Sequence, residues 1–78
     1  MRVVLYSREG CHLCDAAREV LIAERSRIPF DLVEVDVAGD DHLEREYGIR
    51  IPVVEIDGVE RFEYEVDRAE LLAIVREG

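Results

Sequence analysis

Apolar residues at the start of the chain form a nearly continuous run, and the spacing of apolar residues then becomes helical. Residues 2–6 are rich in valine, which is typical of a central strand covered on both faces. Over residues 11–25 the apolar side chains recur at helical spacing, with Cys14, Ala17 and Leu21 on one stripe. The pattern therefore predicts a strand and then a helix that begins near residue 11.

The middle of the chain predicts a second strand and a short helix. Pro29 ends any continuation of the first helix, and residues 31–37 alternate loosely, with valines on one side. A strand, a helix and a strand in close succession form a right-handed crossover, so these two strands should be parallel neighbours. Asp41 and Glu44 form a helix-start signal, and Gly48 can close this helix in a left-handed conformation.

The last third of the chain predicts an antiparallel hairpin and a C-terminal helix. Residues 53–56 form an apolar strand, and the Asp-Gly turn at 57–58 leads into a strand over residues 61–64. A capping box at residues 67–70 begins the last helix. We therefore expect an α/β fold with a four-stranded mixed sheet and helices on both of its faces.

Length and composition indicate one compact domain. With 78 residues, the chain is too short for two hydrophobic cores, so residues 1–78 should form a single domain. Apolar residues make up 49% of the chain and charged residues 37%, which suits a packed core with a charged shell. The apolar start is too brief for a secretion signal and no run reaches membrane-spanning length, so we expect a cytoplasmic protein.

The charge excludes some classes of partner. The formal net charge is -9, with ten arginines and no lysine. A surface of this sign repels phosphate groups, so we expect no nucleic-acid partner and no membrane partner. We also expect the chain to be a monomer.

Two cysteines lie where the first strand gives way to the first helix. Cys11, at the helix start, faces unpaired backbone N–H groups and the positive end of the helix dipole, which favour thiolate over thiol. Cys14 lies one turn further on, close enough to attack a mixed disulfide on Cys11. We therefore predict that Cys11 is the nucleophile and Cys14 the resolving thiol, with positive charge from Arg8 and His12 nearby.

Two other roles for the cysteines compete with this one. A structural disulfide that closes so short a loop would stabilise the fold by only about 2 kcal/mol. A zinc site needs about four ligands, and beyond the cysteines the chain offers only His12, between them, and the distant His42. A dimer that shares metal or cluster ligands stays open as an alternative.

Pro52 enters the third predicted strand directly after the short helix. Proline in a sheet usually marks a strand start or an edge. If the Ile51–Pro52 peptide bond is cis, the backbone of Ile51 can turn outward and offer its N–H and C=O groups to an extended substrate. This role requires the Pro52 loop to lie beside the cysteines.

Two segments resemble the glutaredoxin-like family of the thioredoxin superfamily, and the resemblance covers almost the full chain. Residues 6–14, YSREGCHLC, are similar to the strand end and redox motif of glutaredoxins, including the basic residue Arg8. Residues 47–53, YGIRIPV, resemble the segment that bears the cis-proline of the family. The resemblance implies a thioredoxin-like fold in which Ile51 and Pro52 lie against the redox pair.

The chain departs from glutaredoxins where they hold glutathione. Leu13 stands where dithiol glutaredoxins typically have tyrosine, and residues 62–67, FEYEVD, lack the glycine pair followed by aspartate. We therefore expect no cofactor beyond a redox-active Cys11–Cys14 disulfide. We also expect glutathione to be a poor ligand. The residues expected to contact the substrate are Arg8, His12, Leu13, Ile51 and Pro52.

The leading hypothesis is a thiol-disulfide oxidoreductase whose Cys11–Cys14 pair exchanges electrons with protein or low-molecular-weight disulfides. A thiol or dithiol reductant would complete its cycle. The main alternative is an iron-sulfur or metal-binding module, which the resemblance to cluster-binding glutaredoxins permits. A third hypothesis is a non-catalytic adaptor of thioredoxin fold, in which the cysteines are incidental.

Overall fold

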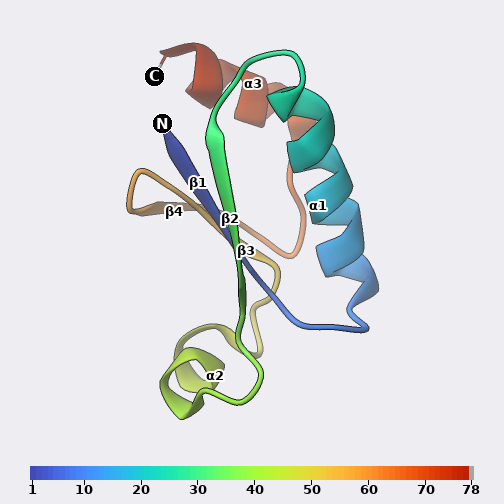
Figure 1. Cartoon of the computed structure of the whole chain (residues 1–78), viewed down its shortest axis with the longest axis vertical. Helices are drawn as coiled ribbons and strands as arrows, with labels where there is room; N and C mark the ends of the chain where they lie inside the picture. The colour runs from blue at the N-terminus through green and yellow to red at the C-terminus, as the bar shows by residue number, and fades with distance from the viewer. Residues whose placement is uncertain (78) are drawn as a thin grey trace.

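The computed structural model describes residues 1–77, and its elements follow the order that the sequence pattern predicts (Figure 1). Their bounds are β1 Arg2–Ser7, α1 His12–Arg25, β2 Asp31–Asp36, α2 Asp41–Tyr47, β3 Val53–Ile56, β4 Val59–Glu63 and α3 Arg68–Glu77. None of the helices within residues 1–77 is long and apolar enough to cross a membrane. Each predicted element is present, with bounds that differ by a residue or two.

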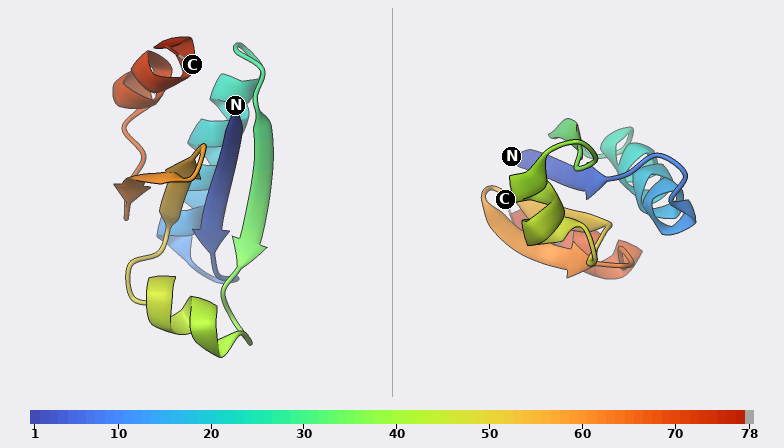
Figure 2. Two further views of the ribbon diagram at one scale, coloured as in Figure 1. Left: turned by 90° about the vertical axis from the view of Figure 1, so that its left-hand side faces the viewer. Right: turned by 90° about the horizontal axis from the view of Figure 1, so that it is seen from below.

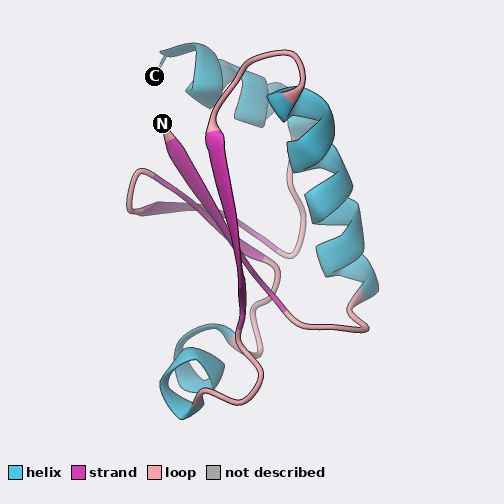
Figure 3. Ribbon diagram, in the orientation of Figure 1, coloured by secondary structure: helices cyan, strands magenta, loops and turns pink. Residues whose placement is uncertain are grey.

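The four strands form one mixed sheet in the order β2-β1-β3-β4 (Figure 3). β1 is parallel to β2, as the crossover rule predicts, and antiparallel to β3. The C-terminal end of β1 therefore lies at the same edge of the sheet as the N-terminal end of β3. The loop that enters α1, the helix α2 and the loop that enters β3 gather at this edge, at the bottom of Figure 1.

One face of the sheet carries the hydrophobic core beneath α1 and α3. The β1 side chains Val3 and Leu5 point to this face and are fully buried, and Leu21 of α1 and Leu71 of α3 pack against them. The buried members of the core are Val3, Leu5, Ala17, Leu21, Phe30, Val54, Ile56, Phe62, Val66, Leu71 and Val75. This core holds α1, and with it the cysteines, against the centre of the sheet.

The helix α2 lies on the other side of the sheet and covers only one end of it (Figure 2). The ring of Tyr47 stacks on Tyr6 of β1 with 3.9 Å between ring centroids. Glu55 of β3 accepts hydrogen bonds from both hydroxyl groups, at 3.2 Å from Tyr6 and 3.1 Å from Tyr47. The nearby Tyr6 hydroxyl, together with burial and the Glu55 carboxylate, raises the pKa of Tyr47. Val4 on this face is only half-buried, so β1 is not fully covered on both faces.

Two details of α2 differ from the prediction. The helix is capped by Asp40, not Asp41, because the Asp40 carboxylate accepts a hydrogen bond from the Leu43 N–H at 3.1 Å. Gly48 adopts a right-handed conformation with φ −51°, so left-handed closure was the wrong reason for its presence. A Cβ atom at position 48 would instead collide with the Glu44 backbone carbonyl oxygen. Close approach of the Gly48 backbone to the preceding turn of α2 is therefore what requires glycine here.

The hairpin begins its second strand earlier than predicted. Asp57 and Gly58 both have positive φ, 51° and 85°, as a two-residue hairpin turn of the type favoured by Asp-Gly requires. Pairing resumes at once, so β4 starts at Val59 and contains an irregularity opposite Val54 and Glu55. The sequence pattern does not reveal this early start, because β4 is an edge strand whose first residues are exposed and largely polar, without the apolar pattern of a buried strand.

Candidate functional site

Cys11 and Cys14 are joined by a disulfide at the start of α1, with 5.2 Å between their Cα atoms. Cys11 is the N-cap of the helix, in an extended conformation with φ −94° and ψ 110°. Its sulfur accepts a hydrogen bond from the Cys14 backbone N–H at 3.1 Å. A sulfur atom in this position satisfies one of the unpaired N–H groups of the first helical turn. The same contact would stabilise negative charge on Cys11 when the pair is reduced.

The two sulfur-bearing residues differ in exposure. Cys14 is fully buried, whereas Cys11 is only half-buried. An incoming disulfide can therefore approach Cys11 but not Cys14 without a change in the protein. This asymmetry agrees with the predicted roles, in which Cys11 attacks a substrate and Cys14 resolves the adduct.

Arg8, three residues before Cys11, does not stand free as a source of positive charge. Its guanidinium forms an ion pair with Glu44 of α2, and its Nε is buried without a hydrogen-bond partner within the described chain. Sequence reasoning assigned Glu44 only to the start of α2. No local signal could reveal the pairing, because the two residues meet only when α2 docks at the end of the sheet.

The remaining predicted contact residues lie in two loops at the same edge of the sheet. His12 and Leu13 are exposed in the first turn of α1. The Ile51–Pro52 peptide bond is cis, as the resemblance of residues 47–53 to the cis-proline segment of glutaredoxins implies. Pro52 is buried and its carbonyl accepts a hydrogen bond from the Tyr64 N–H at 2.8 Å. Within residues 1–77 the backbone N–H and C=O groups of Ile51 form no hydrogen bond with the rest of the chain.

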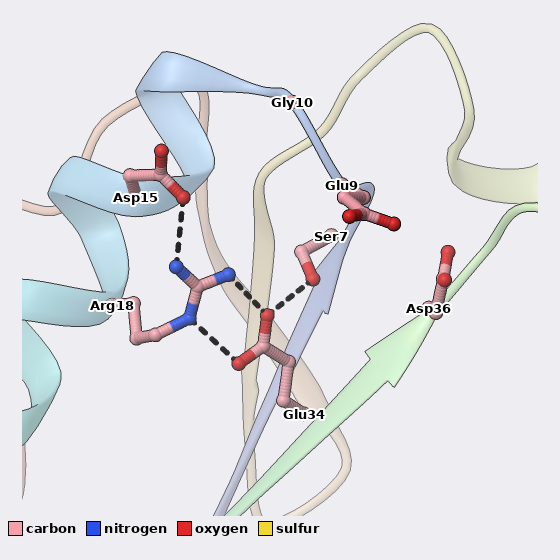
Figure 4. A pocket seen from close by; sticks show the side chains of 7 residues that line it. All are labelled: Ser7, Glu9, Gly10, Asp15, Arg18, Glu34 and Asp36. Atoms are coloured by element: carbon pink, nitrogen blue, oxygen red, sulfur yellow. Dashed lines mark hydrogen bonds and ion pairs between the residues drawn. The ribbon is translucent and has the colours of Figure 1, made fainter.

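An acidic pocket lies between β2, the start of α1 and the loop that leads from β1 to Cys11 (Figure 4). Arg18 of α1 donates to Asp15 at 2.8 Å and, through Nε, to Glu34 of β2 at 2.7 Å. The Ser7 hydroxyl also donates to Glu34, at 2.6 Å. Hydrogen bonds from Arg18 hold the pKa of Glu34 below its usual value, although burial opposes this, and they raise the pKa of Arg18. These contacts tie the helix that carries the cysteines to β2.

An apolar groove lies on the opposite flank of the same helix. It has a volume of about 270 Å³ and is lined by Leu13, Ala16, Ala17, Val20, Tyr64, Glu65 and Val66. Tyr64 has a left-handed backbone, with φ 69°, and its hydroxyl donates to the Ile49 carbonyl at 3.3 Å. In the sequence, Tyr64 is noticeable only as part of the segment that lacks the glycine pair of glutaredoxins. Its place in the groove depends on how the segment after β4 folds back toward α1.

The described residues offer little to a metal ion besides the two cysteines. Within residues 1–77 no group of three or more His, Cys, Asp or Glu side chains is arranged to hold a metal ion. The two histidines, His12 and His42, are exposed on different helices. At the end of the sheet where α1 begins, the described residues therefore form a dithiol–disulfide pair.

Comparison with known proteins identifies the family. The profile of the Glutaredoxin-like domain (DUF836) matches residues 2–76. Uncharacterized proteins of Mycobacterium bovis and Mycobacterium tuberculosis are 38% identical over 77 residues, which span 92% of this chain and 79% of theirs.

Solved structures agree with this assignment. The X-ray structure of target protein XcR50 from X. campestris is 34% identical, with a TM-score of 0.81 and coverage of 97% of each chain. Protein Ne2328 from Nitrosomonas europaea is 32% identical, with a TM-score of 0.80 and coverage of 94% of this chain and 88% of that one. Thioredoxin 1 from Thermosipho africanus, at 15% identity and a TM-score of 0.71 over 99% and 92% of the chains, shares the fold. The chain therefore belongs to the glutaredoxin-like domain family (DUF836) and has a thioredoxin-like fold.

Proposed function

We propose that the protein is a thiol-disulfide oxidoreductase that exchanges electrons with protein or small-molecule disulfides through Cys11 and Cys14. The observation that carries this proposal is the asymmetry of the pair. Cys11 caps the helix and is accessible, and its sulfur accepts the Cys14 N–H, while Cys14 is fully buried. A disulfide with a purely structural role would not require one accessible cysteine and one buried cysteine.

The proposed reduction of a substrate proceeds in two exchanges. The Cys11 thiolate attacks one sulfur of the substrate disulfide, which forms a mixed disulfide and releases the other substrate sulfur as a thiolate that takes up a proton. Cys14 then loses its proton and attacks the Cys11 sulfur, so the second substrate thiol leaves and the Cys11–Cys14 disulfide forms. Two electrons pass from the protein to the substrate. A dithiol reductant returns the protein to its starting state, and the reverse sequence would oxidise a substrate dithiol.

Trapping the mixed disulfide tests the proposal. Cys14→Ser should arrest the reaction as an adduct on Cys11, which intact-mass spectrometry detects and a dithiol releases. Cys11→Ser should form no adduct and reduce no disulfide. An adduct on the Cys11 variant alone would reverse the two roles. If neither variant forms an adduct and the freshly purified wild-type protein absorbs visible light, a metal or cluster role replaces the proposal.

Glutathione is a poor substrate in this proposal. Leu13 and the Tyr64-Glu65 segment depart from the residues with which glutaredoxins hold the tripeptide. The guanidinium of Arg8, which would suit a carboxylate of glutathione, already pairs with Glu44. Reduction of the oxidised protein by glutathione should therefore be slow beside reduction by a dithiol donor. Efficient, saturable turnover of a glutathione mixed disulfide would contradict this part of the proposal.

A further inference from the structure

The apolar groove runs along α1 from its first turn, the turn that the proposed nucleophile Cys11 caps. Leu13, between the two cysteines, forms one wall, and Tyr64 forms part of the opposite wall. These side chains are 54% and 47% exposed, although both are large and apolar. Ile49, whose carbonyl accepts the Tyr64 hydroxyl, is 89% exposed. Leu13 and Tyr64 are thus two of the five large apolar side chains that are exposed within the described chain, and both line the groove.

Tyr64 occupies a backbone conformation that disfavours its own side chain. At φ 69° the backbone is left-handed, which glycine adopts freely but which costs a bulky residue about 1 kcal/mol or more. The tyrosine ring is not buried in compensation, since nearly half of the side chain is exposed. Backbone strain of this kind is found at functional sites, where the retained side chain serves binding. Besides the hydrogen bond from its hydroxyl to Ile49, Tyr64 thus presents a partly exposed ring to the groove.

The charges around the groove restrict its occupant. Glu65 lies in the groove wall, and on the other flank of α1 the acidic pocket adds the carboxylates of Glu9 and Asp36, whereas Asp15 and Glu34 there pair with Arg18. The whole chain carries a net charge of -9. An apolar cleft set in a negative field attracts a ligand that combines an apolar side chain with positive charge. It disfavours an anionic tripeptide such as glutathione.

We infer that the groove binds an extended polypeptide segment of the disulfide substrate, with an apolar side chain next to its half-cystine and with basic residues nearby. The inference rests on the proposed function, because Cys11 must be the atom that attacks. The apolar side chain enters between Leu13 and Tyr64, and Ile51, whose backbone groups have no hydrogen-bond partner within residues 1–77, lies in the loop that precedes β3 at the same end of the sheet. Tyr64 is thus a residue that sets substrate preference.

Disulfide-linked dimers of short peptides provide the test. The reference peptide has leucine before its cysteine and arginine after it, and two others replace leucine by serine or arginine by glutamate. We expect the wild-type protein to prefer the leucine peptide over the serine peptide by about tenfold in kcat/KM, as burial of one apolar side chain allows. It should also prefer arginine over glutamate, and added salt should reduce only this second preference.

Substitutions of residues that line the groove test whether the groove causes the preference for the leucine peptide. Tyr64→Gly and Leu13→Ser should each remove most of the leucine preference, and Tyr64→Phe should retain part of it because the ring remains. Ile22→Ser is the matched control, since Ile22 lies on α1, is 47% exposed and does not line the groove. It should keep the wild-type preference. A purely structural Tyr64 would change the midpoint of thermal unfolding and leave the preference untouched, which would overturn the inference.

Other outcomes separate the inference from the proposed function. If the wild-type protein reduces all three peptides equally, the inference fails and the proposed function stands. If it reduces none of them and forms no mixed disulfide, the proposed function fails. Faster turnover of glutathione disulfide than of the peptides would overturn the inference. A dimer in sedimentation that Tyr64→Gly converts to a monomer would show that a second copy occupies the groove instead.

Discussion

The backbone N–H of Cys14 donates a hydrogen bond to the sulfur of Cys11 at 3.1 Å. The first turn of α1 therefore places the two sulfur atoms in different environments. It directs an N–H group at Cys11, which favours a thiolate there, and it holds Cys14 on the buried stripe of the helix. The unequal environments follow from the spacing of the two cysteines, because a residue three positions after the N-cap turns toward the core.

The first prediction concerns the reactivity of the two reduced thiols. Cys11 should react with iodoacetamide at pH 7 about tenfold faster than Cys14 or more, because it is accessible and a helix N–H group favours its thiolate. Peptide mapping by mass spectrometry after short exposure measures the two rates. Equal labelling of both thiols would show that α1 does not create the asymmetry.

The second prediction concerns the ion pair between Arg8 and Glu44. Glu44→Gln should release the guanidinium of Arg8 to bind a carboxylate, so turnover of a glutathione mixed disulfide should rise by about two- to fivefold, the range expected for an exposed pair. Arg8→Gln should cancel this gain in the double variant. Glu46→Gln on the same helix is the control for a change of net charge. A gain that persists without Arg8 would refute the assignment.

The third prediction concerns stability in acid. The pKa of Glu34 lies below its usual value in the folded chain because Arg18 donates to its carboxylate. A carboxylate of this kind adds to the free energy of unfolding above the unfolded pKa of 4.5, and its contribution is lost as the pH falls through the lower, folded value. Glu34→Gln should therefore reduce the loss of stability between neutral pH and pH 3.

Urea unfolding at several pH values measures this effect. The difference at neutral pH should be below about 1 kcal/mol, because the pair is partly exposed and solvent screens it. Glu19→Gln, on the outer face of α1, should leave the pH dependence as it is in the wild-type protein. An unchanged pH dependence in Glu34→Gln would show that the Arg18 contact is not formed in solution.

The fourth prediction concerns Gly48. Gly48→Ala should lower the free energy of unfolding by about 1–3 kcal/mol, because the added Cβ overlaps the Glu44 carbonyl oxygen and the end of α2 must shift. Gly58→Asn should cost less than about 1 kcal/mol, because asparagine tolerates the left-handed turn conformation and nothing crowds that position. A neutral Gly48→Ala would show that α2 can adjust freely at this point.

The sequence by itself determined the order of elements, the place of the cysteines and the family. These features depend on local signals. Apolar periodicity marks α1 and β1, the Asp-Gly pair at 57–58 marks the hairpin turn, and Asp67 caps α3 by accepting the Glu70 N–H at 3.1 Å. Each signal lies within a few neighbouring residues, so it can be interpreted before any long-range contact is known.

Only the tertiary structure decided what surrounds the cysteines. The partner of Arg8 lies 36 residues away, and that of Arg18, Glu34, lies 16 residues away on another element. Tyr64 reaches the flank of α1 only because the chain after β4 returns across the core. Such contacts depend on how the elements pack, and charged or polar residues at the surface satisfy local rules equally well with many partners. The substrate preference proposed for the groove depends on one such contact, the approach of Tyr64 to α1.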